Sequence, residues 1–151
     1  MSQQYIGTKL INAVVMTRAE YNIFRGWQLP DDENGDDAGY LVEYLDGGKP
    51  NTQQYAGYVS WSPKEQFDKA YRLTNGMNFG LALEALQQGK RVARTGWNGV
   101  GLWLEYIPAT GVDLAFIRMS YPVNSRAYPK GARVPWLASQ TDMLATDWVV
   151  V

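Results

Sequence analysis

The stretch MNFGLALEALQQGKRVARTGWNG, residues 77–99, contains the clearest structural pattern in the chain. Asn78 is a favoured helix N-cap residue, and Gly89 stands where a left-handed C-terminal residue is expected. Between them, apolar side chains recur with the spacing of one helix face: Phe79, Ala82, Leu83 and Leu86. The sequence therefore predicts a helix here, followed by a strand over KRVARTGW.

The remaining part of 77–151 predicts a small antiparallel sheet. Asn98-Gly99 separates KRVARTGW from GVGLWLEYI and is the dipeptide typical of a tight hairpin turn. Further strands are predicted over VDLAFIRMSY and DWVVV. Between these two strands, Ser139 and Asp142 have the spacing of an N-terminal capping pair, which predicts a short helix.

The first half of the chain shows the same kinds of signal. Thr17 and Glu20 form a predicted capping box before a helix that ends at Gly26. GYLVEYL and GYVSW predict two strands, and SPKE predicts a second helix capped by Ser62. LTNG at 73–76 reads as a linker. The predicted fold class is α+β, with two small antiparallel sheet-plus-helix units at 1–73 and 77–151.

Composition narrows the functional classes. Of the 151 residues, 46% are hydrophobic and 19% are charged, enough apolar surface for a folded core. The absence of His and Cys removes the commonest general base, thiolate nucleophiles and sulfur-ligated zinc. We therefore expect no enzymatic activity, no metal and no cofactor.

Charge and hydropathy limit the partners. Residues 1–76 carry seven Lys/Arg against ten Asp/Glu, whereas residues 77–151 carry seven against five. The small positive excess suits a small anion and is too weak for a DNA or RNA footprint. Without an apolar run of roughly 20 residues or a signal peptide, we expect no membrane partner and a cytoplasmic location.

Three motifs then carry a family resemblance. MNFGLALEALQQGKRVARTGWNG, GLWLEY and VPWLASQTDMLATDW occur in this order between Met77 and Val151. This half resembles the Thoeris anti-defence 2 family, small phage proteins that sequester immune signalling nucleotides. Residues 1–76 resemble segments of other phage proteins for which no activity is known to us.

The resemblance implies a sponge that binds glycocyclic ADP-ribose, a cyclic ADP-ribose derivative, without degrading it. The expected place of action is the cytoplasm of an infected bacterial host. Some relatives also hold cyclic dinucleotides. The family architecture is a homotetramer with ligand pockets between protomers. Units of about 75 residues bury little core alone, so we expect a homo-oligomer, a dimer or preferably a tetramer.

A nucleotide site needs a flat aromatic wall, acceptors for sugar hydroxyls and donors for phosphate. With the resemblance, this requirement selects eleven candidate ligand-binding residues: Asn78, Phe79, Arg94, Trp97, Asn98, Trp103, Trp136, Ser139, Gln140, Thr141 and Asp142. No catalytic residue and no metal ligand is assigned.

Each candidate also has a structural explanation. Asn78 and Phe79 can be a helix cap and its first core contact, and Arg94 can be a solvated strand residue. Trp97 and Trp103 can be rings of the core. The alternatives are that Trp97 stacks on a base and that Trp103 forms part of the pocket. Ser139 and Asp142 can simply cap a helix, but capping explains neither Gln140 and Thr141 nor the Trp136 beside them.

Two competing functions remain open at this point. A hydrolase or lyase acting on a nucleotide or sugar would use Asp142 with Glu84 or Glu105, two carboxylates across one cleft. A protein-binding module would instead use the acidic loop at 30–37 to block a host enzyme.

Overall fold

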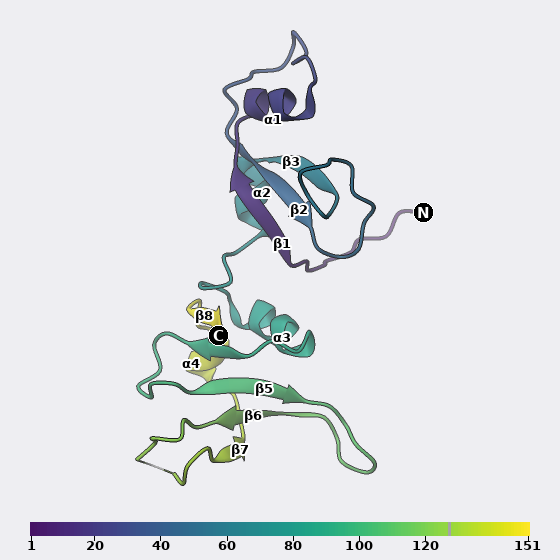
Figure 1. Ribbon diagram of the computed structural model, residues 1–151. Helices are drawn as coiled ribbons and strands as arrows, with labels where there is room; N and C mark the ends of the chain where they lie inside the picture. Colours follow the sequence, from purple (N-terminus) through teal and green to yellow (C-terminus); the bar gives the residue numbers. More distant parts are fainter. Residues whose placement is uncertain (127) are drawn as a thin grey trace. The chain divides into compact units, whose positions relative to one another are not determined.

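The computed structural model describes residues 1–126 and 128–151. The chain divides into two compact units, unit 1 (Met1–Tyr71) and unit 2 (Arg72–Val151), drawn in Figure 1. Unit 1 contains a three-stranded sheet and unit 2 a five-stranded sheet, and all strand pairs are antiparallel. The α+β class predicted from the sequence is confirmed.

Unit 1 is a sheet with strand order β1-β2-β3 and two short helices. Its elements are β1 (Ile11–Val15), α1 (Arg18–Arg25), β2 (Gly39–Tyr44), β3 (Val59–Pro63) and α2 (Lys64–Ala70). The predicted capping box of α1 is present, since Thr17 accepts from Glu20 N and Glu20 accepts from Thr17 N. Gly26 ends the helix in the left-handed conformation with φ 69°.

The start of α2 differs from the prediction. Pro63 occupies the N-cap position and no side chain caps the helix, so Ser62 is not the cap. Instead, Ser62 lies in β3 and pairs with Tyr40 of β2. The ladder of the sheet thus extends to Pro63, two residues beyond the end of the predicted strand GYVSW.

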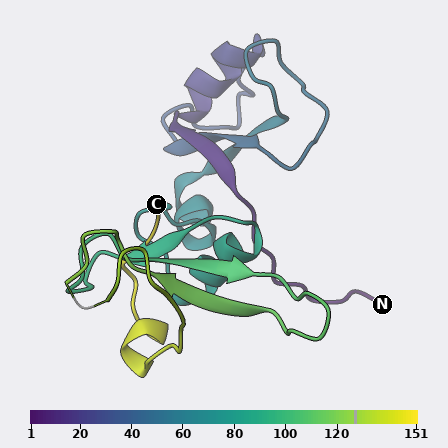
Figure 2. The ribbon, with the colours of Figure 1, turned by 60° about the horizontal axis from the view of Figure 1, so that its bottom comes forward.

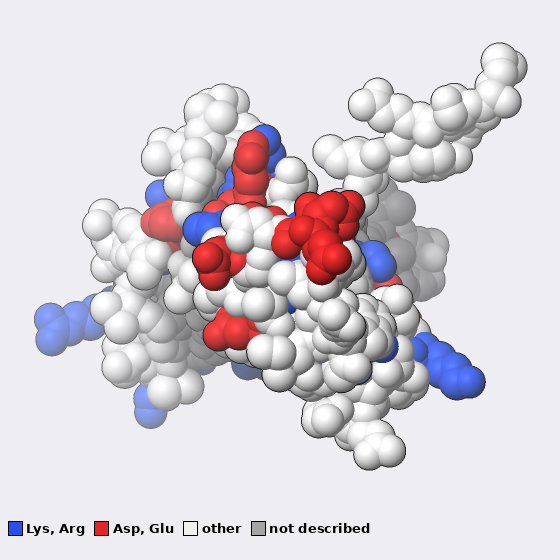
Figure 3. All heavy atoms as spheres, turned by 90° about the horizontal axis from the view of Figure 1, so that it is seen from above, with Lys and Arg blue, Asp and Glu red and all other residues white. Residues whose placement is uncertain are grey.

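The core of unit 1 is small. Tyr21, Leu41 and Val59 form a cluster of buried residues, and Trp61 packs against them. Arg18 binds Glu33 and Asp37 of the loop at 30–37, which holds this acidic loop to α1. Figure 3, seen from the α1 end of unit 1, shows Asp and Glu side chains gathered on that face.

Unit 2 has strand order β7-β6-β5-β4-β8. Its elements are α3 (Phe79–Gln87), β4 (Val92–Arg94), β5 (Trp103–Ile107), β6 (Phe116–Ser120), β7 (Arg133–Pro135), α4 (Gln140–Met143) and β8 (Trp148–Val150). The β5–β6 hairpin projects beyond the other strands in both ribbon views (Figures 1 and 2).

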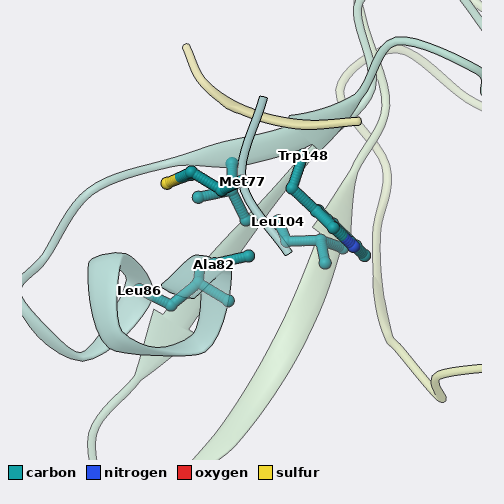
Figure 4. Packing of buried hydrophobic residues seen from close by; sticks show 6 residues of the cluster. Met77, Ala82, Leu86, Leu104 and Trp148 are labelled. Carbon is teal, nitrogen blue, oxygen red and sulfur yellow. The ribbon is translucent and has the colours of Figure 1, made fainter. Parts of the chain in front are cut away.

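The core of unit 2 forms where α3 covers one face of this sheet. Ala82 and Leu86 of α3 meet Val92, Leu104 and Trp148, all between 0% and 1% exposed. Figure 4 shows Met77 and Trp148 beside the side chains of the helix. Met77 and Trp148 also exchange backbone hydrogen bonds of 2.8 and 3.1 Å. The apolar face predicted for 77–99 is therefore the face that builds the core.

Two details of unit 2 correct the sequence prediction. Asn98-Gly99 does not form a tight hairpin turn, because that turn requires positive φ and within this connection only Gly101 has it. A Cβ on Gly99 would lie 2.4 Å from Leu102 Cδ1, so close side-chain approach explains this glycine. Strand β7 was not predicted; it pairs with β6 through Arg118 and Pro135.

The helices of the described residues are all short. None of them is long and apolar enough to traverse a bilayer.

Candidate functional site

Four aromatic rings of unit 2 form one cluster, which we call the aromatic cluster: Phe79, Trp97, Trp136 and Trp148. Trp148 is completely buried and lies between the other rings, with centroid distances of 5.5 Å to Phe79, 5.5 Å to Trp97 and 6.0 Å to Trp136. The other three are partly buried. Three of the predicted site residues are therefore brought together around a core tryptophan.

An apolar groove of about 380 Å³ opens on one side of this cluster. Phe79 and Trp136 line it together with Leu83 of α3 and with Tyr106 and Phe116 of the β5–β6 hairpin. Tyr106 and Phe116 are 37% and 41% exposed, so the groove is accessible. Its volume lies within the range of small-molecule sites, and its walls suit a flat, apolar group.

A polar network holds the other side of the cluster. We call it the Arg94 network; it consists of Arg94, Trp97, Ser139, Asp142 and Asp147. Arg94 donates from Nη1 to Asp142 Oδ1 at 2.9 Å and from Nε to Asp147 Oδ1 at 2.8 Å. Trp97 Nε1 donates to Asp142 Oδ1 at 3.1 Å. Because Arg94 is a β4 residue and Asp142 belongs to α4, the network joins α4 to the sheet.

Asp142 uses both carboxylate oxygens inside the protein. Its Oδ2 accepts from the backbone N of Ser139 at 3.2 Å and from Ser139 Oγ at 2.7 Å. The side chain is only 12% exposed. These bonds to Ser139 make the Asp142 carboxylate part of the loop that leads from Trp136 into α4.

The pKa values of these groups reflect the same contacts. Burial raises the pKa of Asp142, but hydrogen bonds from Ser139, Trp97 and Arg94 outweigh it and hold the pKa at about 2. The hydrogen bond from Arg94 lowers the pKa of Asp147, and both carboxylates raise that of Arg94. The network is therefore fully ionised at neutral pH.

Asp147 is a member that the sequence analysis missed. Its Oδ2 accepts from the backbone N of Gly96 at 2.7 Å, and a Cβ on Gly96 would lie 2.7 Å from that same oxygen. Only glycine therefore lets the chain approach the carboxylate. Two sequence features could have indicated its role: the Thr-Gly pair that follows Arg94 and the position of this acid directly before Trp148.

The remaining predicted residues are distributed around the unit. Asn78 caps α3 by accepting from Leu81 N at 2.9 Å. Gln140 and Thr141 are exposed in the first turn of α4, and Asn98 is exposed in the β4–β5 connection. Trp103 lies on the sheet face opposite α3, since its neighbour Leu104 points into the core. The structure does not bring Trp103 to the aromatic cluster.

Of the acid pairs suggested for a hydrolase, Asp142 and Glu105 are separated. Glu105 shares the Trp103 face and binds Arg118 at 2.9 Å, whereas Asp142 lies on the α3 side with Arg94. The sheet stands between the two carboxylates, so they do not flank a common cleft. Among the described residues, no group of three or more acids is arranged to hold a metal ion.

The fold and the groove define unit 2 as a small α+β module with an aromatic-lined groove beside a closed ionic network. Comparison with known proteins assigns it further. The profile of the Thoeris anti-defense 2-like domain matches residues 77–151. A curated relative, Thoeris anti-defense 2 of Bacillus phage SP01, is 38% identical over 85 residues, which cover 50% of this chain and 94% of the relative.

The chain therefore belongs to the Thoeris anti-defence 2 family. The relative's length corresponds to unit 2 alone, so unit 1 is additional to it.

Proposed function

We propose that this protein captures a cyclic immune signalling nucleotide, glycocyclic ADP-ribose or a related cyclic ADP-ribose, and keeps it intact. Cyclic dinucleotides are a second ligand class under the same proposal. The observation that carries it is the aromatic-lined groove in a unit that spans almost the whole of a Thoeris anti-defense 2 relative. Its place of action is the cytoplasm of the infected bacterial host.

The groove supports binding of the adenine part of such a ligand. Phe79 and Trp136 supply aromatic walls whose ring centroids are 6.1 Å apart. A base stacked on aromatic side chains gains roughly 1–3 kcal/mol. Trp97, fixed by Asp142, contacts Trp136 from behind and keeps this wall in place.

The ligand phosphates require donors other than the Arg94 fork. Arg94 already binds two carboxylates and is only 14% exposed. In the proposal, a second protomer supplies donors and the protein is a homo-oligomer, with a tetramer favoured over a dimer. Native mass spectrometry with a panel of cyclic nucleotides reports subunit number and bound ligand together.

The test of capture separates binding from turnover. The protein is incubated with glycocyclic ADP-ribose, freed of unbound nucleotide and heat-denatured, and the released nucleotide is analysed by mass spectrometry. We expect the intact nucleotide in a fixed ratio to protomers, and protection that scales with the amount of protein. Release of a cleaved product, or no retained nucleotide, would refute the proposal.

A further inference from the structure

Strand β1 (Ile11–Val15) is the outer strand of the sheet of unit 1, and one of its edges is free (Figure 1). Within residues 1–126 and 128–151, its only strand partner is β2. A free strand edge presents a row of backbone donors and acceptors to any further strand. The proposed groove lies in unit 2, so this edge belongs to a different part of the chain.

The ladder with β2 determines which backbone groups of β1 point outward. Met16 N donates to Gly39 O at 3.0 Å, directly beyond the end of β1. Along an antiparallel ladder, hydrogen-bonded pairs alternate with pairs that are not hydrogen-bonded. Counting back from Met16, the positions without bonds to β2 are Val15, Ala13 and Ile11. The N–H and C=O groups of these three residues therefore point away from the sheet.

This edge lacks the features that usually prevent strand pairing. Natural edge strands are commonly protected by a charged residue, a proline or a bulge. The sequence of β1 is INAVV and its register with β2 is continuous, so it contains none of the three. Val14 and Val15 are 48% and 77% exposed. Because branched apolar side chains stabilise strand pairs, the edge favours a further apolar strand.

We propose that this edge pairs with β1 of a second copy of the chain, antiparallel and centred on Ala13. In this register Ala13 faces Ala13 of the second copy, and Ile11 faces Val15. The three outward-pointing residues of one strand thus meet the same three of the other, and their N–H and C=O groups bond to one another. The two sheets form one continuous sheet across a two-fold axis, which is the self-complementary contact of a symmetric dimer.

The charges that flank β1 allow two copies to approach. Lys9 is neutralised within its own copy by Asp46 at 3.0 Å and faces Thr17 of the second copy in this register. Arg18 is bound to Glu33 at 3.0 Å and also faces a threonine. No like charges are opposed, and the uncharged strand offers no ion pair to a charged peptide. A second copy of β1 therefore suits this edge better than a charged segment of another protein.

This contact goes beyond the oligomer of the proposed function, because it lies in unit 1. The Thoeris anti-defense 2 relative corresponds in length to unit 2 alone and has no counterpart of β1. A five-residue strand pair is smaller than a standard protein interface of about 1,200–2,000 Å². We therefore expect a dissociation constant in the micromolar range.

The chain contains no cysteine, so a single introduced thiol reports this contact directly. Ala13→Cys places the thiols of the two copies at the two-fold axis, where the Cα atoms are about 5.5 Å apart, within the range of a disulfide. Val15→Cys is the matched control on the same exposed edge, but its two thiols lie roughly 13 Å apart in this register. Under mild oxidation, the full chain with Ala13→Cys should form a disulfide-linked dimer at least tenfold faster than the chain with Val15→Cys.

Charged substitutions in the Ala13→Cys background test the register. Adding Val15→Lys should slow dimer formation at least tenfold, because it places an ammonium group against Ile11 of the second copy. Adding Ile11→Glu as well should restore the rate, because each new carboxylate then faces an ammonium group across the two strands. Ile11→Glu combined with Val15→Glu opposes like charges and should stay slow.

Circular dichroism melts establish that each variant is folded. Equal dimer formation by the two cysteine variants, or no covalent dimer from a folded Ala13→Cys chain, would overturn the proposal. A rate that Val15→Lys leaves unchanged, or that Ile11→Glu fails to restore, would overturn the register and with it the proposed pairing.

The test is independent of nucleotide capture. Val15→Lys should leave retention of glycocyclic ADP-ribose unchanged, because Val15 belongs to unit 1 and the groove to unit 2. Conversely, a substitution that fills the groove should leave the disulfide-linked dimer of Ala13→Cys unchanged.

Discussion

Asp142 shows how one buried carboxylate can fix several segments of the chain relative to one another. It accepts from Arg94, Trp97 and Ser139, so its two oxygens connect β4, the β4–β5 connection and α4. Ser139 and Asp142 were predicted to cap a helix, and this capping is confirmed. The long-range bonds to Arg94 and Trp97 could not be predicted, because they join residues 48 and 45 positions apart.

Protonation of Asp142 should cost stability at low pH. Its pKa is about 2 in the folded protein, below the ordinary value of 3.8, so its contribution is complete above pH 4 and is lost between pH 4 and 2. The lowered pKa of Asp142 contributes about 2 kcal/mol to the free energy of unfolding at neutral pH. Urea unfolding of wild type and Asp142→Asn at pH 7 and pH 3 measures it.

The variant should be less stable than wild type at pH 7 and should lose less on acidification. Asp113→Asn, which changes an exposed carboxyl of the same unit, serves as the control. Equal pH dependence of wild type and Asp142→Asn would contradict the assignment.

Trp97 can be tested by replacing its indole with a smaller aromatic ring that has no donor. Trp97→Phe keeps an aromatic ring but loses the 3.1 Å bond to the Asp142 carboxylate. A hydrogen bond to a charged group contributes about 1.5–3 kcal/mol, so the unfolding free energy should fall by about 2 kcal/mol. Nucleotide retention should fall too, since the ring behind Trp136 is no longer fixed. Trp27→Phe, at a ring 54% exposed in unit 1, should change neither quantity.

At the scale of elements, the helix over 79–87 was predictable from local signals, whereas the Asn98-Gly99 turn and the Ser62 cap were wrong and the tertiary features were not predicted. The helix over Phe79–Gln87 and its Asn78 cap followed from neighbouring residues and are confirmed. Strand β7 is three residues long and depends on pairing with β6, so no local periodicity indicated it. The groove could not be predicted either, because Leu83, Tyr106 and Phe116 come from three elements that only the fold brings together.

Filling the groove tests its role as the ligand site. Ala115 lines the groove at an exposed position of the β5–β6 hairpin, so Ala115→Trp should be tolerated by the fold. The added ring competes with the ligand for space, and we expect nucleotide retention to fall at least tenfold. The measurement is equilibrium dialysis with glycocyclic ADP-ribose. Ala109→Trp, in the same hairpin loop and outside the groove lining, should bind like wild type; parallel loss in both variants would place the ligand elsewhere.

At the scale of the whole molecule, two separate buried clusters stabilise the chain. Leu41 belongs to the cluster of unit 1 and Leu86 to that of unit 2, and both side chains are fully buried. The ligand proposed here binds only the second unit. Ligand binding should therefore stabilise one part of the protein and not the other.

Thermal unfolding followed by calorimetry should show two transitions. Leu86→Ala should lower the transition of unit 2 through a loss of about 2–5 kcal/mol, and Leu41→Ala should lower that of unit 1 similarly. Nucleotide should raise only the transition that Leu86→Ala lowers. A single transition shifted by both substitutions would show that the units unfold together.

The paired backbone bonds between Met77 and Trp148 have a consequence for how this unit can be rearranged. They bring Met77, which precedes α3, and Trp148, the first residue of β8, within hydrogen-bonding distance of each other. Domains whose ends are adjacent tolerate insertion into other chains and circular permutation. A permuted unit 2, with its old ends joined by a short glycine-serine linker and new ends opened in the exposed β5–β6 loop, should keep its sheet order. A further domain can therefore be attached to unit 2 at this point without a change in the order of its strands.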